Sequence, residues 1–224
     1  MRKSTKATID DGCNPELVAG ADFYLPLGIP VIHKPKEILI PSGITPFSYR
    51  ERVVGSDEAI GFNEKDMNFS DVLRAPKDYI EDFSRFRMMI SPDCSLFRDA
   101  PLSVQLTNVY RNRAIGSYYQ RQGIYVIPQV RWGNEYTYTT KYFPDKIAFL
   151  GVEKHSIVAI GTYGCINTKD DKYHFSAGLD AMIATLEPTV ILVYGNMPKK
   201  IFGRYKDFVI FHQFPDWISR MHTR

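Results

Sequence analysis

The chain has 224 residues, 44% of them hydrophobic, which suits one globular domain or one domain with an extension. Its net charge of +3 is too small to mark a nucleic-acid binder by bulk electrostatics, and no apolar run approaches the roughly 20 residues that a membrane helix needs. Cys13, Cys94 and Cys165 are too widely spaced for a disulfide framework or a CxxC metal pair, so we expect a reducing cytoplasm. The first residues hold no apolar stretch after their charges, and no secretory signal is expected.

The first quarter of the chain is rich in proline. Residues 15–57 hold six of the fourteen prolines, a spacing that excludes a long helix. Such a segment is too short to enclose an interior of its own. We therefore expect residues 1–57 to form an irregular extension that wraps the core, and residues 58–224 to form an α/β core domain.

From about residue 58, short apolar runs alternate with segments of helical periodicity. The runs predict strands near 59–62, 87–91, 125–130, 156–161, 190–194 and 208–211. The periodic segments predict helices near 77–85, 101–122 and 174–186. Residues 134–150 alternate tyrosine and threonine with polar neighbours, which indicates an edge strand or a hairpin arm. This order predicts a mostly parallel sheet with crossover helices, either an open doubly wound sheet or a partial barrel.

The longest predicted helix carries apolar and polar side chains in a mixed pattern. Val109 belongs to its packed side, whereas residues 121–122 are expected on a solvated face. Asn108, Arg111 and Arg113 crowd the centre of the helix, close to the inward turn. They predict a buried polar network, and the arginines also suit a phosphate or a carboxylate.

Polar side chains follow each predicted strand, and a parallel sheet gathers those strand ends at one edge, where ligand sites form. These side chains are Asn63, Glu64 and Asp66 after the first strand, Asp93, Cys94 and Ser95 after the second, Gln129, Arg131 and Trp132 after the third, Thr162, Tyr163 and Cys165 after the fourth, and Tyr194 and Asn196 after the fifth. We therefore expect one site at this edge.

Within that edge, each residue type indicates a role. Asp93 is the candidate catalytic residue, as a proton acceptor or nucleophile, and would also orient an arginine. Arg131 offers a planar fork for phosphate or carboxylate, and Trp132 offers a stacking face for a base. The candidate ligand-binding residues are Asn108, Arg111, Arg131, Trp132, Thr162 and Tyr194.

Each of these residues also has a purely structural interpretation. Asp93 follows a proline and is a common turn residue. Thr162 lies in a Gly-Thr-Tyr-Gly run that suits a tight turn. In the structural interpretation, Arg131 and Trp132 stack on each other as a pair, and Asp93 with Arg131 closes the end of the sheet.

Several well-defined motifs are missing from the sequence. There is no GxGxxG after a strand, no GxxxxGK[ST] loop, no HExxH and no GxSxG. The five histidines show no metal-ligand spacing. We expect no metal site, and the motifs point to no particular cofactor.

Three segments carry a resemblance to a known family. NVYRNRAIGSYYQRQGIYVIPQVRWG, SIVAIGTYGC and TVILVYGNMP resemble an uncharacterised domain-of-unknown-function family that is frequent in phages and mobile elements of Gram-positive bacteria. The resemblance covers about residues 58–214 and leaves the proline-rich segment outside. It implies a phage, prophage or plasmid setting and a host cytoplasm. The family brings no established activity, so it implies no catalytic residue.

Two functions remain open at this point. The first is a phage or mobile-element protein that handles a nucleotide or a nucleic acid at the strand-end edge, with Asp93, Arg131 and Trp132 holding a base and a phosphate. The second is a non-catalytic protein that binds a host defence or replication factor through a tyrosine- and arginine-rich surface. Neither involves a membrane. Burial of Asp93 in a pocket would favour the first.

Overall fold

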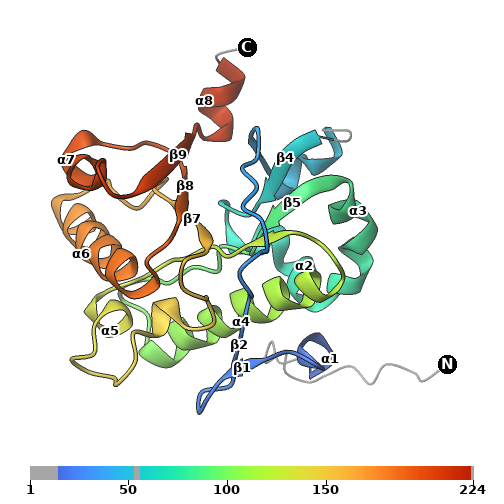
Figure 1. Ribbon diagram of the computed structural model, residues 1–224, viewed down its shortest axis with the longest axis horizontal. Coiled ribbons are helices and arrows are strands. Elements are labelled where there is room, and N and C mark those ends of the chain that lie inside the picture. Colours follow the sequence, from blue (N-terminus) through green and yellow to red (C-terminus); the bar gives the residue numbers. More distant parts are fainter. Residues whose placement is uncertain (1–14, 53–55, 223–224) are drawn as a thin grey trace.

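The computed structural model describes residues 15–52 and 56–222, and it shows strands at the centre with helices around them (Figure 1). The first parallel sheet consists, in spatial order, of β3 (Ile44–Pro46), β4 (Ser56–Gly61), β5 (Phe86–Ile90) and β6 (Val126–Ile127). The second consists of β7 (Ile157–Gly161), β8 (Val190–Tyr194) and β9 (Ile210–Phe214), also parallel. A small antiparallel pair is formed by β1 (Phe23–Tyr24) and β2 (Ile29–Pro30). The predicted parallel α/β architecture is confirmed.

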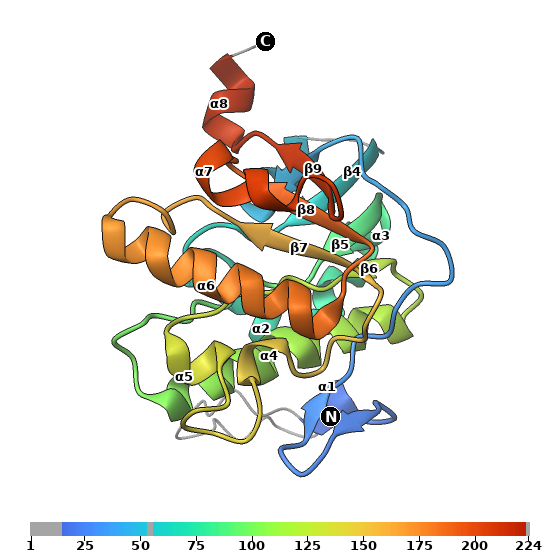
Figure 2. The same cartoon turned by 60° about the vertical axis from the view of Figure 1, so that its left-hand side comes forward.

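Helices connect the strands and lie on their outer side, with the two long ones, α4 and α6, seen along their length in Figure 2. The α-helices are α1 (Pro15–Val18), α2 (Ser70–Arg74), α3 (Ile80–Ser84), α4 (Leu102–Arg121), α5 (Glu135–Tyr138), α6 (Lys169–Leu186), α7 (Lys199–Phe202) and α8 (Trp217–His222). Short 3₁₀ turns are η1 (Phe47–Arg52), η2 (Asp66–Phe69), η3 (Pro76–Tyr79), η4 (Ile147–Phe149) and η5 (Gly203–Tyr205).

The two sheets meet at an isolated parallel bridge between Gln129 and Ala159. The Ala159 amide donates to the Pro128 carbonyl at 2.9 Å, and the Val130 amide donates to the Ala159 carbonyl at 2.8 Å. Because Pro128 has no amide hydrogen, β6 ends at Ile127, earlier than the sequence predicts. The spatial order therefore runs from β3 to β9 in sequence order, without the reversal that defines a doubly wound sheet.

Side chains on one face of all seven of these strands share a single apolar cluster. Its buried members are Ile44, Ala59, Met88, Ile90, Ile127, Ile157, Ala159, Val190, Leu192, Tyr194 and Phe214. Since the first and the last strand contribute to the same cluster, the sheets curl around it. In the described part of the chain no ladder joins β3 to β9, so the curl is a partial barrel and not a closed one.

Helix α8 lies at the opening between β3 and β9. Both terminal nitrogens of Arg220 donate to the carboxylate of Glu58 on β4, and this pair is largely shielded from water. Trp217 stacks on Tyr49 with ring centroids 4.9 Å apart. These contacts hold α8 against the first sheet.

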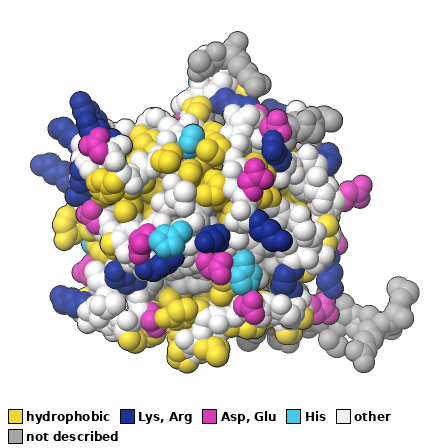
Figure 3. Space-filling model, in the orientation of Figure 1, with side chains coloured by type: hydrophobic (Ala, Val, Ile, Leu, Met, Phe, Trp, Pro, Cys, Tyr) yellow, Lys and Arg dark blue, Asp and Glu magenta, His cyan; other side chains and the backbone are white. Residues whose placement is uncertain are grey.

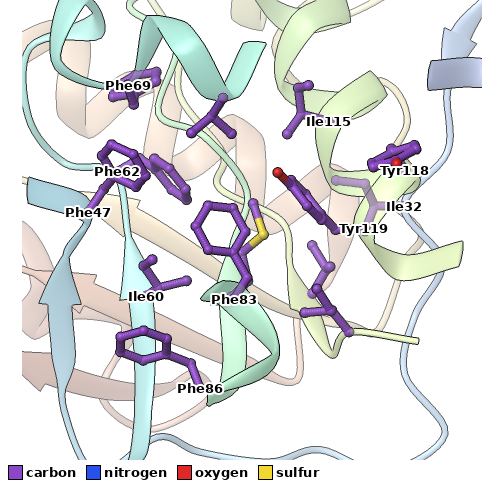
Figure 4. Packing of buried hydrophobic residues seen from close by; sticks show 14 of the residues in the cluster. Ile32, Phe47, Ile60, Phe62, Phe69, Phe83, Phe86, Ile115, Tyr118 and Tyr119 are labelled. Carbon is purple, nitrogen blue, oxygen red and sulfur yellow. The ribbon is translucent and has the colours of Figure 1, made fainter. Parts of the chain in front are cut away.

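The outer face of the first sheet packs on α2, α3 and α4 through aromatic side chains (Figure 4). The ring centroids of Phe62 and Phe83 are 5.8 Å apart, and those of Phe83 and Tyr119 are 4.9 Å apart. A corresponding outer cluster lies between α6 and the second sheet, and Phe175 and Leu179 of α6 belong to it. Strand side chains thus alternate between the inner cluster and the helices, the pattern of a sheet that is buried on both faces.

The prediction of an edge strand or hairpin arm at residues 134–150 was wrong, because this segment forms α5 and η4. The Asn134 side chain accepts the amide of Tyr136 at 3.1 Å, which caps a helical turn. Tyr138 is buried, with its hydroxyl 2.8 Å from His174 Nδ1. The alternation of tyrosines therefore reflects one buried ring in a short helix.

Two other boundaries differ from the sequence prediction. Helix α6 begins at Lys169 and not near residue 174, because Thr168 and Asp171 form a reciprocal capping box. Strand β9 begins at Ile210 and not at residue 208, because the amides of Phe208 and Val209 bond back to the carbonyl of Tyr205.

The proline-rich segment contributes to the sheet as well as covering α4. Ile44 of β3 lies opposite Ala59 of β4 in parallel register, so the boundary expected at residue 57 falls inside β4, which is paired with a strand of the proline-rich segment. Upstream, the Ile32 amide donates to the Gly151 carbonyl at 2.9 Å, and the His33 amide donates to Gln120 Oε1 at 2.8 Å. These bonds tie the segment to the outer side of α4 and to the chain before β7.

The polar network predicted on the long helix is centred on Arg113, which is only 2% exposed. Its guanidinium donates to the carbonyls of Leu150 at 2.8 Å, Gln129 at 2.9 Å and Ala148 at 3.1 Å, and to Asn112 Oδ1. Burial lowers the pKa of Arg113 to about 9, so the side chain keeps its proton at pH 7. The cation is stabilised by carbonyl dipoles at the junction of the two sheets.

We expect Arg113→Met to lower the free energy of unfolding by about 3 kcal/mol or more, because it leaves buried carbonyls without donors. Arg87→Met is the control, since Arg87 is exposed and pairs with Asp57 at the surface, and its loss should cost less than about 1 kcal/mol. Urea unfolding of both variants measures the difference. Equal losses would contradict the role of the network.

A second comparison tests which side of α4 is buried. Val109 is 3% exposed, so Val109→Asp should unfold the protein or destabilise it severely. Gln122 is an exposed residue at the end of the helix, and Gln122→Ala should change stability by less than about 0.5 kcal/mol. Arg121 is exposed too, but its guanidinium donates to the carbonyls of Leu17 and Ala19, which makes it a poorer control. Thermal melting measures both variants. Equal melting temperatures would show that the face of α4 assigned as buried is wrong.

Candidate functional site

The carboxyl ends of four neighbouring strands meet at one polar cluster. Asp93, after β5, is 4% exposed, and its Oδ2 accepts from Arg131 at 2.6 Å and from Asn63 at 3.1 Å. Arg131 follows the junction strand, and its other terminal nitrogen lies 3.4 Å from Cys165 Sγ, after β7. The carboxylate of Asp93 raises the pKa of Arg131, which keeps the ion pair formed.

Arg131 and Trp132 point to opposite sides of the sheet, because successive side chains alternate. Arg131 lies on the side of Ile127 and Gln129, toward the concave face. Trp132 instead packs near Phe175 on α6, with ring centroids 5.3 Å apart, and its Nε1 donates to the His174 carbonyl at 3.2 Å. The pair does not stack, and the indole is held by protein on the α6 side.

The other predicted ligand-binding residues lie in two further places. Thr162 is 1% exposed and donates to the Tyr194 carbonyl at 3.3 Å, while the Tyr194 hydroxyl accepts the Trp217 amide at 2.9 Å. Asn108 donates to the Ser95 carbonyl at 2.7 Å and accepts from Arg111 at 3.3 Å. Asn108 and Arg111 line a separate hollow of about 240 Å³. The structure therefore joins Asp93 to Arg131 and sets Asn108, Arg111, Thr162 and Tyr194 apart from this pair, whereas Trp132 lines the same cavity as Arg131.

A cavity of about 700 Å³ opens beside Arg131, whose ion-pair partner Asp93 lies behind the cavity wall. Its walls come from the loops after β5, β6 and β7 and from the first turns of α6, through residues 96–99, 130–135, 160–161, 164–165, 170–171 and 174–175. Arg98 closes one side by binding the carboxylates of Asp170 and Asp171. This size is in the range of small-molecule sites.

Sequence reasoning missed His174, which lines this cavity from α6. Its Nδ1 lies 2.8 Å from the Tyr138 hydroxyl, and the carboxylates of Asp170 and Glu135 lie 3.7 Å and 3.9 Å from its ring nitrogens. Burial raises the pKa of Tyr138 to about 12, so its hydroxyl stays protonated. The capping box at Thr168 was the signal that could have placed His174 one turn inside the helix.

Some buried polar atoms at this edge have no hydrogen-bond partner among the described residues. They are Asp93 Oδ1 and both side-chain atoms of Gln129, and Gln105 Oε1 on α4 is a further case. Buried polar atoms are almost always paired, and exceptions gather at functional sites. The unpaired groups of Asp93 and Gln129 both lie at the carboxyl ends of the strands.

No group of three or more His, Cys, Asp or Glu side chains is arranged to hold a metal ion in residues 15–52 and 56–222. None of the helices described there is long and apolar enough to cross a membrane.

Fold and site together define an α/β protein with a curled parallel sheet and a polar cavity at the carboxyl edge of its strands. Residues 21–215 match the family described as "Domain of unknown function (DUF4417)", and the chain belongs to this family. The match begins well before residue 58, the start expected from the resemblance.

Two curated relatives come from phages. The chain is 32% identical over 149 residues to the "Gene 1 protein" of Mycobacterium phage D29. This match covers 66% of this chain and 53% of that protein. It is 30% identical over 149 residues to the "Gene 1 protein" of Mycobacterium phage L5, covering 66% of this chain and 62% of that protein. The matched region thus spans little more than half of each relative. No solved structure matches the chain.

Thiol reactivity tests the environment of the edge. Burial raises the pKa of both Cys94 and Cys165, but Cys165 lines the cavity whereas Cys94 is 2% exposed. In a Cys13→Ser variant, iodoacetamide should modify Cys165 slowly at pH 7 and faster as the pH rises above 9, because the thiolate is the reactive form. Cys94 should react only in urea. Mass spectrometry locates the label, and fast labelling of Cys94 in the folded protein would contradict this geometry.

Proposed function

We propose that this phage-related protein binds a nucleotide, free or within a nucleic-acid strand, in the cavity at the carboxyl edge of its curled sheet. The observation that carries the proposal is the buried Asp93–Arg131 pair beside a cavity of about 700 Å³, with one carboxylate oxygen unpaired. Ligands of barrel-like and open α/β folds bind at this edge, and a buried unpaired acceptor there favours a ligand that donates to it.

The charges around the cavity indicate which part of a nucleotide would enter. Arg98 is neutralised by Asp170 and Asp171, and the acidic Asp99 and Glu135 also line the walls. The lining therefore has no excess of positive charge for a polyphosphate chain. A planar base would lie inward, against Arg131 and Asp93, and the phosphate would remain toward solvent.

The same geometry would support chemistry on the bound base. Asp93 offers its unpaired oxygen as proton acceptor or nucleophile, which keeps the catalytic role proposed for it from the sequence. His174, hydrogen-bonded to Tyr138 on the α6 side, is a second proton-transfer group on the cavity wall. Whether a reaction follows binding is measured by product formation, and the binding proposal does not depend on it.

The alternative is a non-catalytic protein that binds a host defence or replication factor. Large apolar side chains are exposed near the C-terminus, with Phe208 at 68%, Ile218 at 60% and Ile210 at 56% exposure. Figure 3 shows hydrophobic side chains gathered on the surface over α7 and β9. Exposed apolar surface of this kind favours a protein partner.

Calorimetric titration with the four nucleoside monophosphates and with short single-stranded DNA and RNA tests the proposal. Wild-type protein should bind at least one of these ligands. Arg131→Gln should weaken that binding at least about tenfold, because a charge-assisted contact worth about 1.5–3 kcal/mol is lost. Arg87→Gln, at an exposed arginine on β5, should bind as wild type does. Failure of the wild-type protein to bind any ligand in the panel would overturn the proposal and favour the interaction protein.

A further inference from the structure

We infer that the edge site recognises a guanine-type base, through hydrogen bonds to its O6, N1–H and N2–H₂ groups. This inference rests on the proposed function and names the base that the site prefers. The groups that would read the base are Asp93 Oδ1 and the side-chain amide of Gln129. Asp93 and Gln129 are 4% and 1% exposed, and these atoms have no partner in the described part of the chain.

The unpaired atoms define what a ligand must supply. Asp93 Oδ1 and Gln129 Oε1 are acceptors and each requires an N–H, while Gln129 Nε2 is a donor and requires an acceptor. An occupant that satisfies all three presents two donors and one acceptor along one edge. An apolar occupant would leave all three buried groups unpaired, which is unfavourable.

Gly161 connects these atoms to the cavity. It lines the cavity, and a Cβ at this position would lie 3.7 Å from Gln129 Nε2 and 2.8 Å from Asn63 Nδ2. Asn63 in turn donates to Asp93 Oδ2 at 3.1 Å, so Gln129, Asn63 and Asp93 surround one small region of the concave face. The Asn63 amide occupies the space beside Gly161, so a ligand reaches that region from the cavity only once this side chain has moved.

Access to the carboxylate requires a movement of Asn63. This side chain is half-buried and makes one hydrogen bond to Asp93, whereas Arg131 holds the same oxygen at the shorter distance of 2.6 Å. Rotation of Asn63 would leave the Asp93–Arg131 pair intact. The base would then take the place of the asparagine amide.

The order of donors and acceptors distinguishes the bases. Guanine presents O6, N1–H and N2–H₂ in a row, so the Gln129 amide can donate to O6 and accept from N1–H while Asp93 Oδ1 accepts from N2–H₂. Adenine and cytosine place a ring-nitrogen lone pair next to the exocyclic amine, and that lone pair would face an acceptor oxygen of the site. Uracil and thymine have a single N–H on this edge and leave one acceptor unpaired. Sites built for a donor reject analogues that lack it.

Matched nucleotides test the preference. Guanosine monophosphate should bind at least about tenfold more tightly than inosine monophosphate, which differs only by the N2 amine, because one hydrogen bond to a charged acceptor is missing. Adenosine and uridine monophosphates should bind more weakly still. A single-stranded DNA with one guanine, compared with oligothymidine, shows whether the site also takes the base from a strand.

Variants separate recognition from a structural role. Gln129→Met keeps the volume and removes an amide that has no partner, so its melting temperature should equal or exceed that of wild type while guanosine monophosphate binding falls at least about tenfold. Gly161→Ala should also weaken binding, because its Cβ fills the approach. Asn63→Ala should bind within about threefold of wild type, since Asn63 yields its place, which corresponds to less than about 0.7 kcal/mol.

The outcomes distinguish failure of the guanine assignment from failure of the proposed nucleotide binding. Equal affinity for all monophosphates, or guanosine monophosphate binding by Gln129→Met at the wild-type level, would overturn the guanine assignment and leave nucleotide binding at the edge intact. A lower melting temperature of Gln129→Met with unchanged binding would identify Gln129 as structural and overturn the assignment too. No binding of any nucleotide by wild type would overturn both.

Discussion

The junction between the two parallel sheets depends on one buried cation, Arg113. The sheet ladder is interrupted where Pro128 lacks an amide hydrogen, and the carbonyl of Gln129 is bonded instead by Arg113 at 2.9 Å and by Asn112 at 3.2 Å. Arg113 also reaches the carbonyls of Ala148 and Leu150, so helix α4 holds the chain that enters β7. A buried charge is costly unless its hydrogen bonds are made, and here carbonyl oxygens provide them.

The same network sets the position of the candidate site. The Asn112 side chain donates to the carbonyl of Pro92, immediately before Asp93, at 2.5 Å. Ser91 Oγ accepts the backbone amide of Gln129 at 2.8 Å. The two strand ends that carry Asp93 and Arg131 are therefore fixed relative to each other by side chains behind them. Preorganisation of this kind is what a site needs to hold polar groups within hydrogen-bond distance of a ligand.

The curl of the sheet explains why one edge carries a cavity. Strands in sequence order, all parallel, place their crossover helices on one side and their carboxyl ends on one rim. The curl stops short of closure, and α8 covers the opening through the Arg220–Glu58 pair and the Trp217–Tyr49 stack. The match to the phage Gene 1 proteins covers 53% and 62% of their lengths, so those proteins extend beyond the matched region.

The sequence alone determined the parallel α/β class, because apolar runs such as 156–161 and 190–194 and the period of the long helix are local patterns. It also indicated that Asp93 and Arg131 lie at the same edge, since strand ends of a parallel sheet converge. Only the tertiary structure decided that Trp132 faces α6, that Asn108 and Arg111 line another hollow, and that His174 reaches the cavity. The direction of Trp132 depends on how side chains alternate after the two-residue strand β6. The position of His174 depends on a helix that begins at a capping box. A shift of one residue in a strand reverses every side chain, so a local pattern could not fix them.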